Sequence, residues 1–157
     1  MADYQLYCFG ESGNAYKAAL MLELCELDWE PRFVDFFNGE TRTPDYRKNV
    51  NEMGEAPVLV HGGKKLSQSG VILDYLAEQS RKFGPKSDDE RREIFRWMLF
   101  DNHKLTSYTA TLRFMVSLAK TGETPVTEFL RQRSTTALGI LNDHLGKADW
   151  VAAGRPT

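Results

Sequence analysis

The sequence predicts a small α/β domain followed by an all-helical domain. Three observations support this. Strand-like and helix-like segments alternate over the first 83 residues, a hairpin signal occurs at Gly62 and Gly63, and only helical patterns follow Pro85. The predicted domains cover residues 1–83 and 88–157. A chain of 157 residues suits one domain or two small ones.

The first three elements are predicted to form a strand–helix–strand unit. The segment of residues 5–9 is short, aromatic and β-prone, which predicts a strand. A polar segment that contains glycines ends this strand. A helical pattern covers residues 15–27, with Ser12 and Asn14 as candidate caps. Residues 30–37 predict a second strand. This order favours a parallel pair joined by a right-handed crossover.

The rest of the first domain is predicted to contain a short helix, a hairpin and a longer helix. Residues 43–50 form a weak, polar helical pattern. Residues 57–61 and 64–67 predict two strands joined by the glycine turn. A helix is expected over residues 69–83, and one side of it is expected to carry Val71, Ile72, Tyr75, Leu76 and Gln79.

Two amphipathic helices are predicted in the second domain. Asp88 or Asp89 can cap the first, and Asp101 falls inside its apolar face, which comprises Ile94, Met98, Leu105, Tyr108, Leu112, Met115 and Ala119. Thr124 and Pro125 are typical of a helix start. The apolar residues that follow are Val126, Leu130, Ala137, Leu138, Leu141 and Leu145. Because two such helices bury little surface, and residues 150–157 lead toward another cap, we expect this domain to be incomplete.

Composition excludes several classes of function. A net charge of −2 gives no electrostatic reason to bind nucleic acid or an anionic membrane, and the N-terminal segment is not a secretory signal. Cys8 and Cys25 form no CxxC pair, which favours a reduced, cytoplasmic setting. No metal is expected, because the histidines are too scattered: His61, His103 and His144.

The segment from Asn51 to Leu76 carries the clearest chemistry. Pro57 opens a strand, and a proline there lies at an edge or bends the chain. Ser69 can cap the next helix, whose first N–H groups and positive dipole end attract a carboxylate. Pro57 is interpreted either as an ordinary strand opening or as part of a ligand site, and Ser69 either as a cap alone or as an anion-binding residue.

These segments resemble the glutathione S-transferase family, in its bacterial type with a serine-type active-site loop. LYCFGESGNAYKAAL is similar to the family's first strand, active-site loop and first helix, and GEAPVLVHGGKKLSQSGVILDYL to its glutathione-binding segment. The resemblance implies a thioredoxin-like N-terminal domain, a helical C-terminal domain and a homodimer. It also implies glutathione as cosubstrate and no metal.

The resemblance implies a role for each matching residue. Ala56 would pair through its backbone with the cysteinyl part of glutathione, with Pro57 held cis. Gln68 and Ser69 would take the γ-glutamyl carboxylate. Met53 lies in the loop that borders the glycyl end.

Further roles follow from the same resemblance. Glu55, in the loop with Met53, stands where a basic residue is common in the family. Ser12 would donate to the thiol sulfur, with Asn14 as the alternative donor. Asp101 is interpreted either as a break in the helical stripe or as a contact to the glutathione amino group, across a dimer.

Tyr7 and Cys8 lie within the first strand, where side chains more often pack than react, so cysteine chemistry is disfavoured. The expected function is therefore transfer of glutathione to an electrophilic small molecule. The alternatives are a non-catalytic glutathione-binding or thioredoxin-fold interaction protein, and a glutathione-dependent thiol-disulfide or peroxide reductase.

Overall fold

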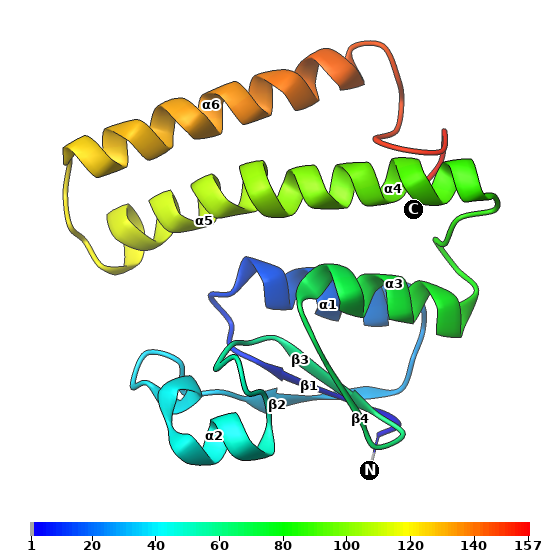
Figure 1. Ribbon diagram of the computed structural model, residues 1–157, viewed down its shortest axis with the longest axis vertical. Coiled ribbons are helices and arrows are strands. Elements are labelled where there is room, and N and C mark those ends of the chain that lie inside the picture. The colour runs from blue at the N-terminus through cyan, green and yellow to red at the C-terminus, as the bar shows by residue number, and fades with distance from the viewer. Residues whose placement is uncertain (1) are drawn as a thin grey trace. The chain divides into compact units, whose positions relative to one another are not determined.

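The computed structural model describes residues 2–157. They fall into two compact units, one ending at Lys82 and the other beginning at Phe83 (Figure 1). The N-terminal unit contains a sheet with helices, and the C-terminal unit is helical. This is the fold class that the sequence predicts.

The N-terminal sheet has four strands in the order β2-β1-β3-β4. The strands are β1 (Tyr4–Cys8), β2 (Trp29–Phe33), β3 (Val58–His61) and β4 (Lys64–Ser67). β1 pairs parallel to β2 and antiparallel to β3, and β3 pairs antiparallel to β4. The parallel pair and the hairpin are thus confirmed, and both hairpin glycines have the positive φ that such a turn requires.

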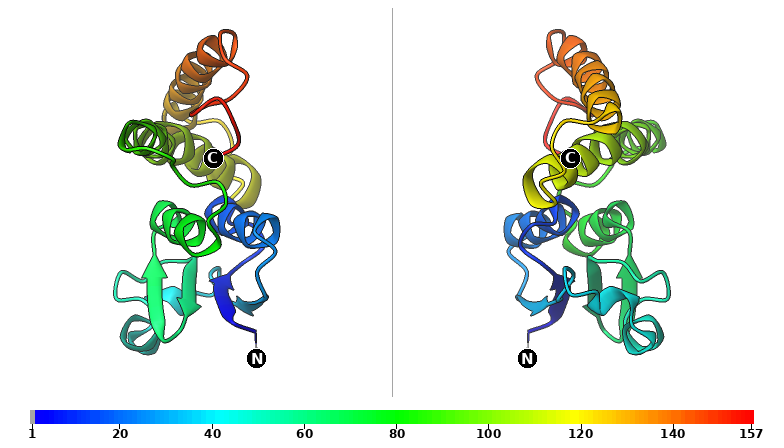
Figure 2. Two further views of the ribbon diagram at one scale, coloured as in Figure 1. Left: turned by 90° about the vertical axis from the view of Figure 1, so that its right-hand side faces the viewer. Right: turned by 90° about the vertical axis from the view of Figure 1, so that its left-hand side faces the viewer.

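Helices α1 (Gly13–Leu24) and α3 (Ser69–Ser80) lie side by side over one face of this sheet (Figure 2). Both are predicted by sequence. The short η1 (Glu40–Arg42) and α2 (Pro44–Asn49) follow β2, and Thr43 caps α2 through its side chain. The layer between sheet and helices contains the fully buried Leu6, Leu22, Leu59, Ile72 and Leu76. Each such side chain stabilises the fold by about 1.5–3 kcal/mol.

Several predicted elements end earlier than expected. α1 and α3 stop at Leu24 and Ser80, because Glu26 and Arg81, both at φ 57°, take left-handed backbone conformations that a helix does not tolerate. β2 ends at Phe33, not at residue 37. Beyond β2 the chain turns, and the Phe36 N–H donates to the Val34 carbonyl at 2.9 Å.

The predicted buried side of α3 is partly wrong. Ile72 and Leu76 are buried as expected, and Ala77 joins them. Val71 and Gln79, by contrast, are exposed. The helix therefore buries a narrower stripe than the sequence pattern predicts.

In the C-terminal unit one long helical segment precedes a second helix. The first comprises α4 (Asp88–Phe100), the π-helical turn η2 (Asp101–Thr106), α5 (Ser107–Arg113) and the π-helical turn η3 (Phe114–Leu118). Ser87 caps α4 by accepting from the Glu90 N–H, so the predicted caps Asp88 and Asp89 are wrong. Both lie in the first turn, where acidic residues suit the helix dipole.

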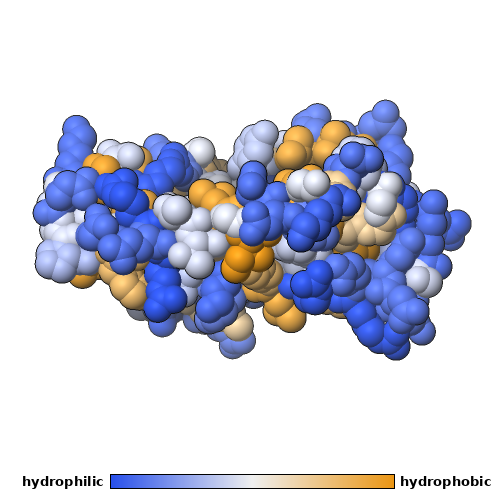
Figure 3. Space-filling view, turned by 90° about the horizontal axis from the view of Figure 1, so that it is seen from above, coloured by the Kyte–Doolittle hydropathy of each residue, from blue (hydrophilic) through white to orange (hydrophobic). Residues whose placement is uncertain are grey.

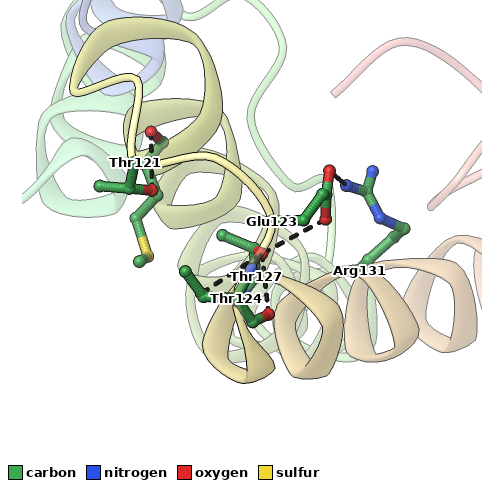
Figure 4. A network of polar contacts seen from close by, with 6 residues as sticks. Thr121, Glu123, Thr124, Thr127 and Arg131 are labelled. Atoms are coloured by element: carbon green, nitrogen blue, oxygen red, sulfur yellow. Dashed lines mark hydrogen bonds and ion pairs between the residues drawn. The ribbon is translucent and has the colours of Figure 1, made fainter.

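The second helix, α6 (Pro125–Leu145), begins at the predicted cap. The Thr124 hydroxyl accepts from the Thr127 N–H at 3.1 Å, and the Thr124 N–H donates to the Thr127 hydroxyl at 2.8 Å. Figure 4 shows this reciprocal pair beside Glu123, which accepts from Arg131 at 2.7 Å. Both donors at the helix start are thereby satisfied.

The buried stripe of α6 differs from the predicted one. It consists of Thr127, Leu130, Ser134 and Ala137, at helical spacings of three and four. The predicted Val126, Leu138 and Leu145 are exposed. Figure 3 shows apolar side chains interrupting a largely hydrophilic surface. No helix of the described residues is long and apolar enough to cross a membrane.

Candidate functional site

Ser12 occupies the turn between β1 and α1. Its N–H donates to the Phe9 carbonyl at 3.2 Å, and its hydroxyl oxygen accepts from the Ala15 N–H at 3.1 Å. Since the oxygen is the acceptor in this cap, the hydroxyl hydrogen is available to donate to another atom. The two interpretations of Ser12, as a cap and as a donor, are therefore compatible.

The starts of α1 and α3 are joined by a side-chain hydrogen bond. The Ser69 hydroxyl donates to Asn14 Oδ1 at 3.3 Å, although the two residues are 55 positions apart. Neither helix has an acidic residue in its first turn. Two positive helix ends thus lie together at Ser12, Asn14 and Ser69, which favours an anionic ligand.

Ser69 is not the cap of α3. Gln68 occupies that position, with a left-handed φ of 68° and no side-chain bond to the helix. Ser69 is the first residue of the helix. The expectation that Ser69 caps this helix is therefore wrong, because its hydroxyl bonds to Asn14 instead.

The Gln68 side chain is held by the loop before β3. Its amide nitrogen donates to Glu55 Oε2 at 2.7 Å and lies 3.8 Å from Met53 Sδ. The structure thus brings Met53, Glu55 and Gln68 together. Glu55 orients the amide group of Gln68, a role that the sequence does not reveal.

The backbone of this loop is fixed from inside the protein. The Tyr46 hydroxyl and the Asn51 amide nitrogen both donate to the Glu55 carbonyl, at 3.0 and 3.1 Å. The peptide bond that follows Glu55–Ala56, Ala56–Pro57, is cis. Sequence reasoning missed Tyr46 and Asn51; the one available signal was a tyrosine in an otherwise polar helix.

Asp101 belongs to the C-terminal unit, at the start of η2. Its Oδ1 accepts a hydrogen bond from the Thr106 hydroxyl at 2.9 Å. The carboxylate in the apolar stripe therefore has a polar partner on its own helix. Its contact with glutathione stays a prediction.

The competing candidates in β1, Tyr7 and Cys8, are half-buried. Of the histidines, His61 stacks on Tyr4 with ring centroids 3.9 Å apart, and His144 packs on Trp97 at 4.5 Å.

Cys8 is expected to react slowly with alkylating agents. Burial raises the pKa of the Cys8 thiol, and only the thiolate is strongly nucleophilic. At pH 8 we expect iodoacetamide to modify Cys8 more slowly than free cysteine, as followed by peptide mass spectrometry. The same chain in urea is the control and should react at the rate of free cysteine. An equal rate in the folded protein would contradict this and favour cysteine-based chemistry.

Comparison with known proteins identifies the family. Residues 2–78 match the model of the glutathione S-transferase N-terminal domain. The chain is 35% identical to a possible glutathione S-transferase from Rhodopseudomonas palustris, with a TM-score of 0.91 over 99% of this chain and 78% of that one. It is also 25% identical to glutathione transferase URE2P6 from Phanerochaete chrysosporium, whose structure is a complex with oxidized glutathione, with a TM-score of 0.87 over 99% of this chain and 74% of that one.

Among curated proteins, Glutathione S-transferase 1 from Dianthus caryophyllus is 43% identical over 75 residues, which is 48% of this chain and 34% of that protein. The chain spans 56% of a second plant relative. It thus covers from a third to somewhat more than half of these relatives. The thioredoxin-like sheet, the helical unit that follows it and the extent of the structural match lead to one conclusion: the chain belongs to the glutathione S-transferase family.

Proposed function

We propose that the protein binds glutathione and activates its thiol for attack on an electrophilic small molecule. The observation that carries this proposal is the Ser12 hydroxyl, which caps α1 through its oxygen and keeps its hydrogen for a ligand. The family membership and the complex of URE2P6 with oxidized glutathione support glutathione as the ligand.

The free energy needed to lower the thiol pKa is within the range that Ser12 can supply. A free cysteine thiol has a pKa of about 8.5, and lowering it by about two units requires about 2.7 kcal/mol of preferential stabilisation of the thiolate. A hydrogen bond to a charged group is worth about 1.5–3 kcal/mol, and a helix N-terminus about 0.3–1 kcal/mol more. Ser12 at the start of α1 therefore suffices without a cationic side chain.

The remaining predicted residues are proposed to hold the tripeptide. Gln68 and Ser69 would bind the γ-glutamyl carboxylate at the start of α3, and Ala56 would pair with the cysteinyl part. Met53, in the loop before β3, lies beside the Gln68 side chain. Asn14 Oδ1 accepts from Ser69, so Asn14 is proposed to support Ser69 first and to act on the thiol only as the alternative to Ser12.

An aromatic cluster next to Ser12 supports an apolar electrophile. Phe9 stacks on Phe36 with ring centroids 4.4 Å apart, and Phe37 packs edge-on against both rings. Phe37 is 53% exposed, and Phe9 lies three residues before Ser12. An aryl or alkyl electrophile would find apolar surface close to the thiol.

The proposal is tested by titrating bound glutathione. We expect ultraviolet absorbance to show thiolate with an apparent pKa of about 6.5, two units below that of free thiol. S-methylglutathione, which has no ionisable thiol, is the control. Bound glutathione that keeps a normal thiol pKa would favour the non-catalytic alternative, and absence of binding by calorimetry would overturn the proposal.

A further inference from the structure

Two buried side chains donate to the same carbonyl oxygen in the loop before β3, which is proposed to bind glutathione. The Tyr46 hydroxyl and the Asn51 amide nitrogen donate to the Glu55 carbonyl at 3.0 and 3.1 Å. Tyr46 is 2% exposed and Asn51 is 8% exposed, so both donors approach from the protein interior. Burial, followed by the charge of Glu40, raises the pKa of Tyr46 to about 12, which keeps its hydroxyl protonated as a donor.

The donors are themselves held rigidly. Asn51 Oδ1 accepts from the Met53 N–H at 3.1 Å, and the Asn51 carbonyl accepts from the Gly54 N–H at 2.9 Å. The Asn51 N–H donates to the Tyr46 carbonyl at 3.1 Å, at the end of α2. Tyr46 and Asn51 thus hydrogen-bond to Met53, Gly54 and Glu55, and these bonds restrict rotation of the Glu55–Ala56 peptide.

Fixing the Glu55 carbonyl also fixes the Ala56 N–H. The Glu55–Ala56 peptide is trans, since within residues 2–157 the cis bond is Ala56–Pro57. In a planar trans peptide the C=O and N–H groups point in opposite directions. Because the carbonyl faces the interior donors, the N–H of the half-buried Ala56 faces away from them. Hydrogen bonds accepted by a carbonyl also polarise the N–H of the same peptide and make it a stronger donor.

We propose that Tyr46 and Asn51 are positioning residues for glutathione, which aim and polarise the Ala56 N–H toward the cysteinyl carbonyl of the ligand. This inference rests on the proposed function, because it needs glutathione as the ligand. Neither residue touches the ligand in this scheme. Their effect on glutathione binding is transmitted by the Glu55–Ala56 peptide group.

The test uses Tyr46→Phe, which removes the hydroxyl and keeps the ring. Tyr75→Phe is the control, because Tyr75 is a half-buried tyrosine whose hydroxyl bonds to His61 at 2.7 Å, outside the proposed glutathione site. By calorimetry, we expect Tyr46→Phe to bind glutathione about three- to ten-fold more weakly, the equivalent of one neutral hydrogen bond. Tyr75→Phe should bind it as the wild type does.

A second ligand separates positioning from general damage. In a glutathione analogue with an alkene in place of the Cys–Gly peptide bond, no cysteinyl carbonyl accepts from Ala56. The wild type and Tyr46→Phe should bind this analogue equally. In addition, the Ala56 amide proton resonance of the free protein should move upfield in Tyr46→Phe and stay in place in Tyr75→Phe.

Each outcome bears on a different claim. Equal loss of affinity for both ligands in Tyr46→Phe would show a general structural role and overturn the inference. Unchanged glutathione affinity in Tyr46→Phe, with normal binding by the wild type, would overturn the inference and leave the proposed function standing. A wild-type protein that binds no glutathione would overturn the proposed function and the inference with it.

Discussion

Replacing Ser12 by alanine is expected to slow glutathione conjugation at neutral pH by roughly 10- to 150-fold. The variant loses a hydrogen bond to a developing thiolate, worth about 1.5–3 kcal/mol, and each 1.4 kcal/mol is a factor of ten. The loss should fall on kcat/KM with an activated aryl halide as electrophile. Glutathione affinity, which depends on Gln68, Ser69 and Ala56 in this proposal, should change little.

Ser12 has two roles in this proposal, as a hydrogen-bond donor to the thiolate and as the cap of α1, and a second variant separates them. Ser12→Ala also removes the acceptor for the Ala15 N–H and is expected to lower the free energy of unfolding by about 1 kcal/mol, whereas glycine at a cap costs only a few tenths. Ser12→Gly should therefore be as slow as Ser12→Ala but more stable, and Ser12→Thr should keep both functions. All variants should approach the wild-type rate at pH values above the pKa of free thiol. Full activity in Ser12→Gly would move the role to Asn14.

Replacing Gly54 by alanine is expected to destabilise the N-terminal unit by roughly 3 kcal/mol, the sum of a left-handed backbone penalty and overpacking. Gly54 has a φ of +67°, and a Cβ there would lie 2.8 Å from the backbone carbonyl oxygen of Thr41. The Arg47 guanidinium would be 3.1 Å away. The side chain of Arg47 can move, but the Thr41 backbone cannot without disturbing η1.

The matched control is Gly63→Ala in the hairpin. Gly63 has a φ of +78°, and a Cβ added there would meet no atom of the described residues within 4 Å, so alanine incurs the backbone penalty alone. Urea unfolding should show a loss for Gly54→Ala about 1–3 kcal/mol larger than for Gly63→Ala. Gly54→Ala should also weaken glutathione binding, because the loop leads directly to Ala56. Equal stability of the two variants would show that the loop relaxes freely.

Much of the fold could be predicted because its signals are local. Thr124 followed by proline marks the start of α6, Ser12 marks the start of α1, and adjacent glycines mark the β3–β4 turn. In each case the interaction that fixes the element joins residues within one turn of each other. A few consecutive residues are therefore enough to predict it. Ser12, Gln68 and Ser69 are site candidates because the segments that contain them resemble those of the family.

Other features depend on residues far apart in the chain. Ser69 is paired with Asn14 instead of capping its own helix, and this contact spans 55 positions. Gln68, not Ser69, takes the cap position, and its side chain donates to Glu55. The sequence predicts broad apolar faces for α3 and α6, yet packing covers only a narrow stripe of each.

The sequence by itself determined the order of strands and helices and the caps at Ser12 and Thr124, and its resemblance to the family supplied the candidate residues for glutathione. The tertiary structure decided how those residues are held. Ser69 and Asn14 show the difference most clearly: they are 55 positions apart in the sequence, but folding places the Ser69 hydroxyl 3.3 Å from Asn14 Oδ1. Hydrogen bonds between distant segments form only once the core brings the segments together, and local patterns contain no record of that geometry.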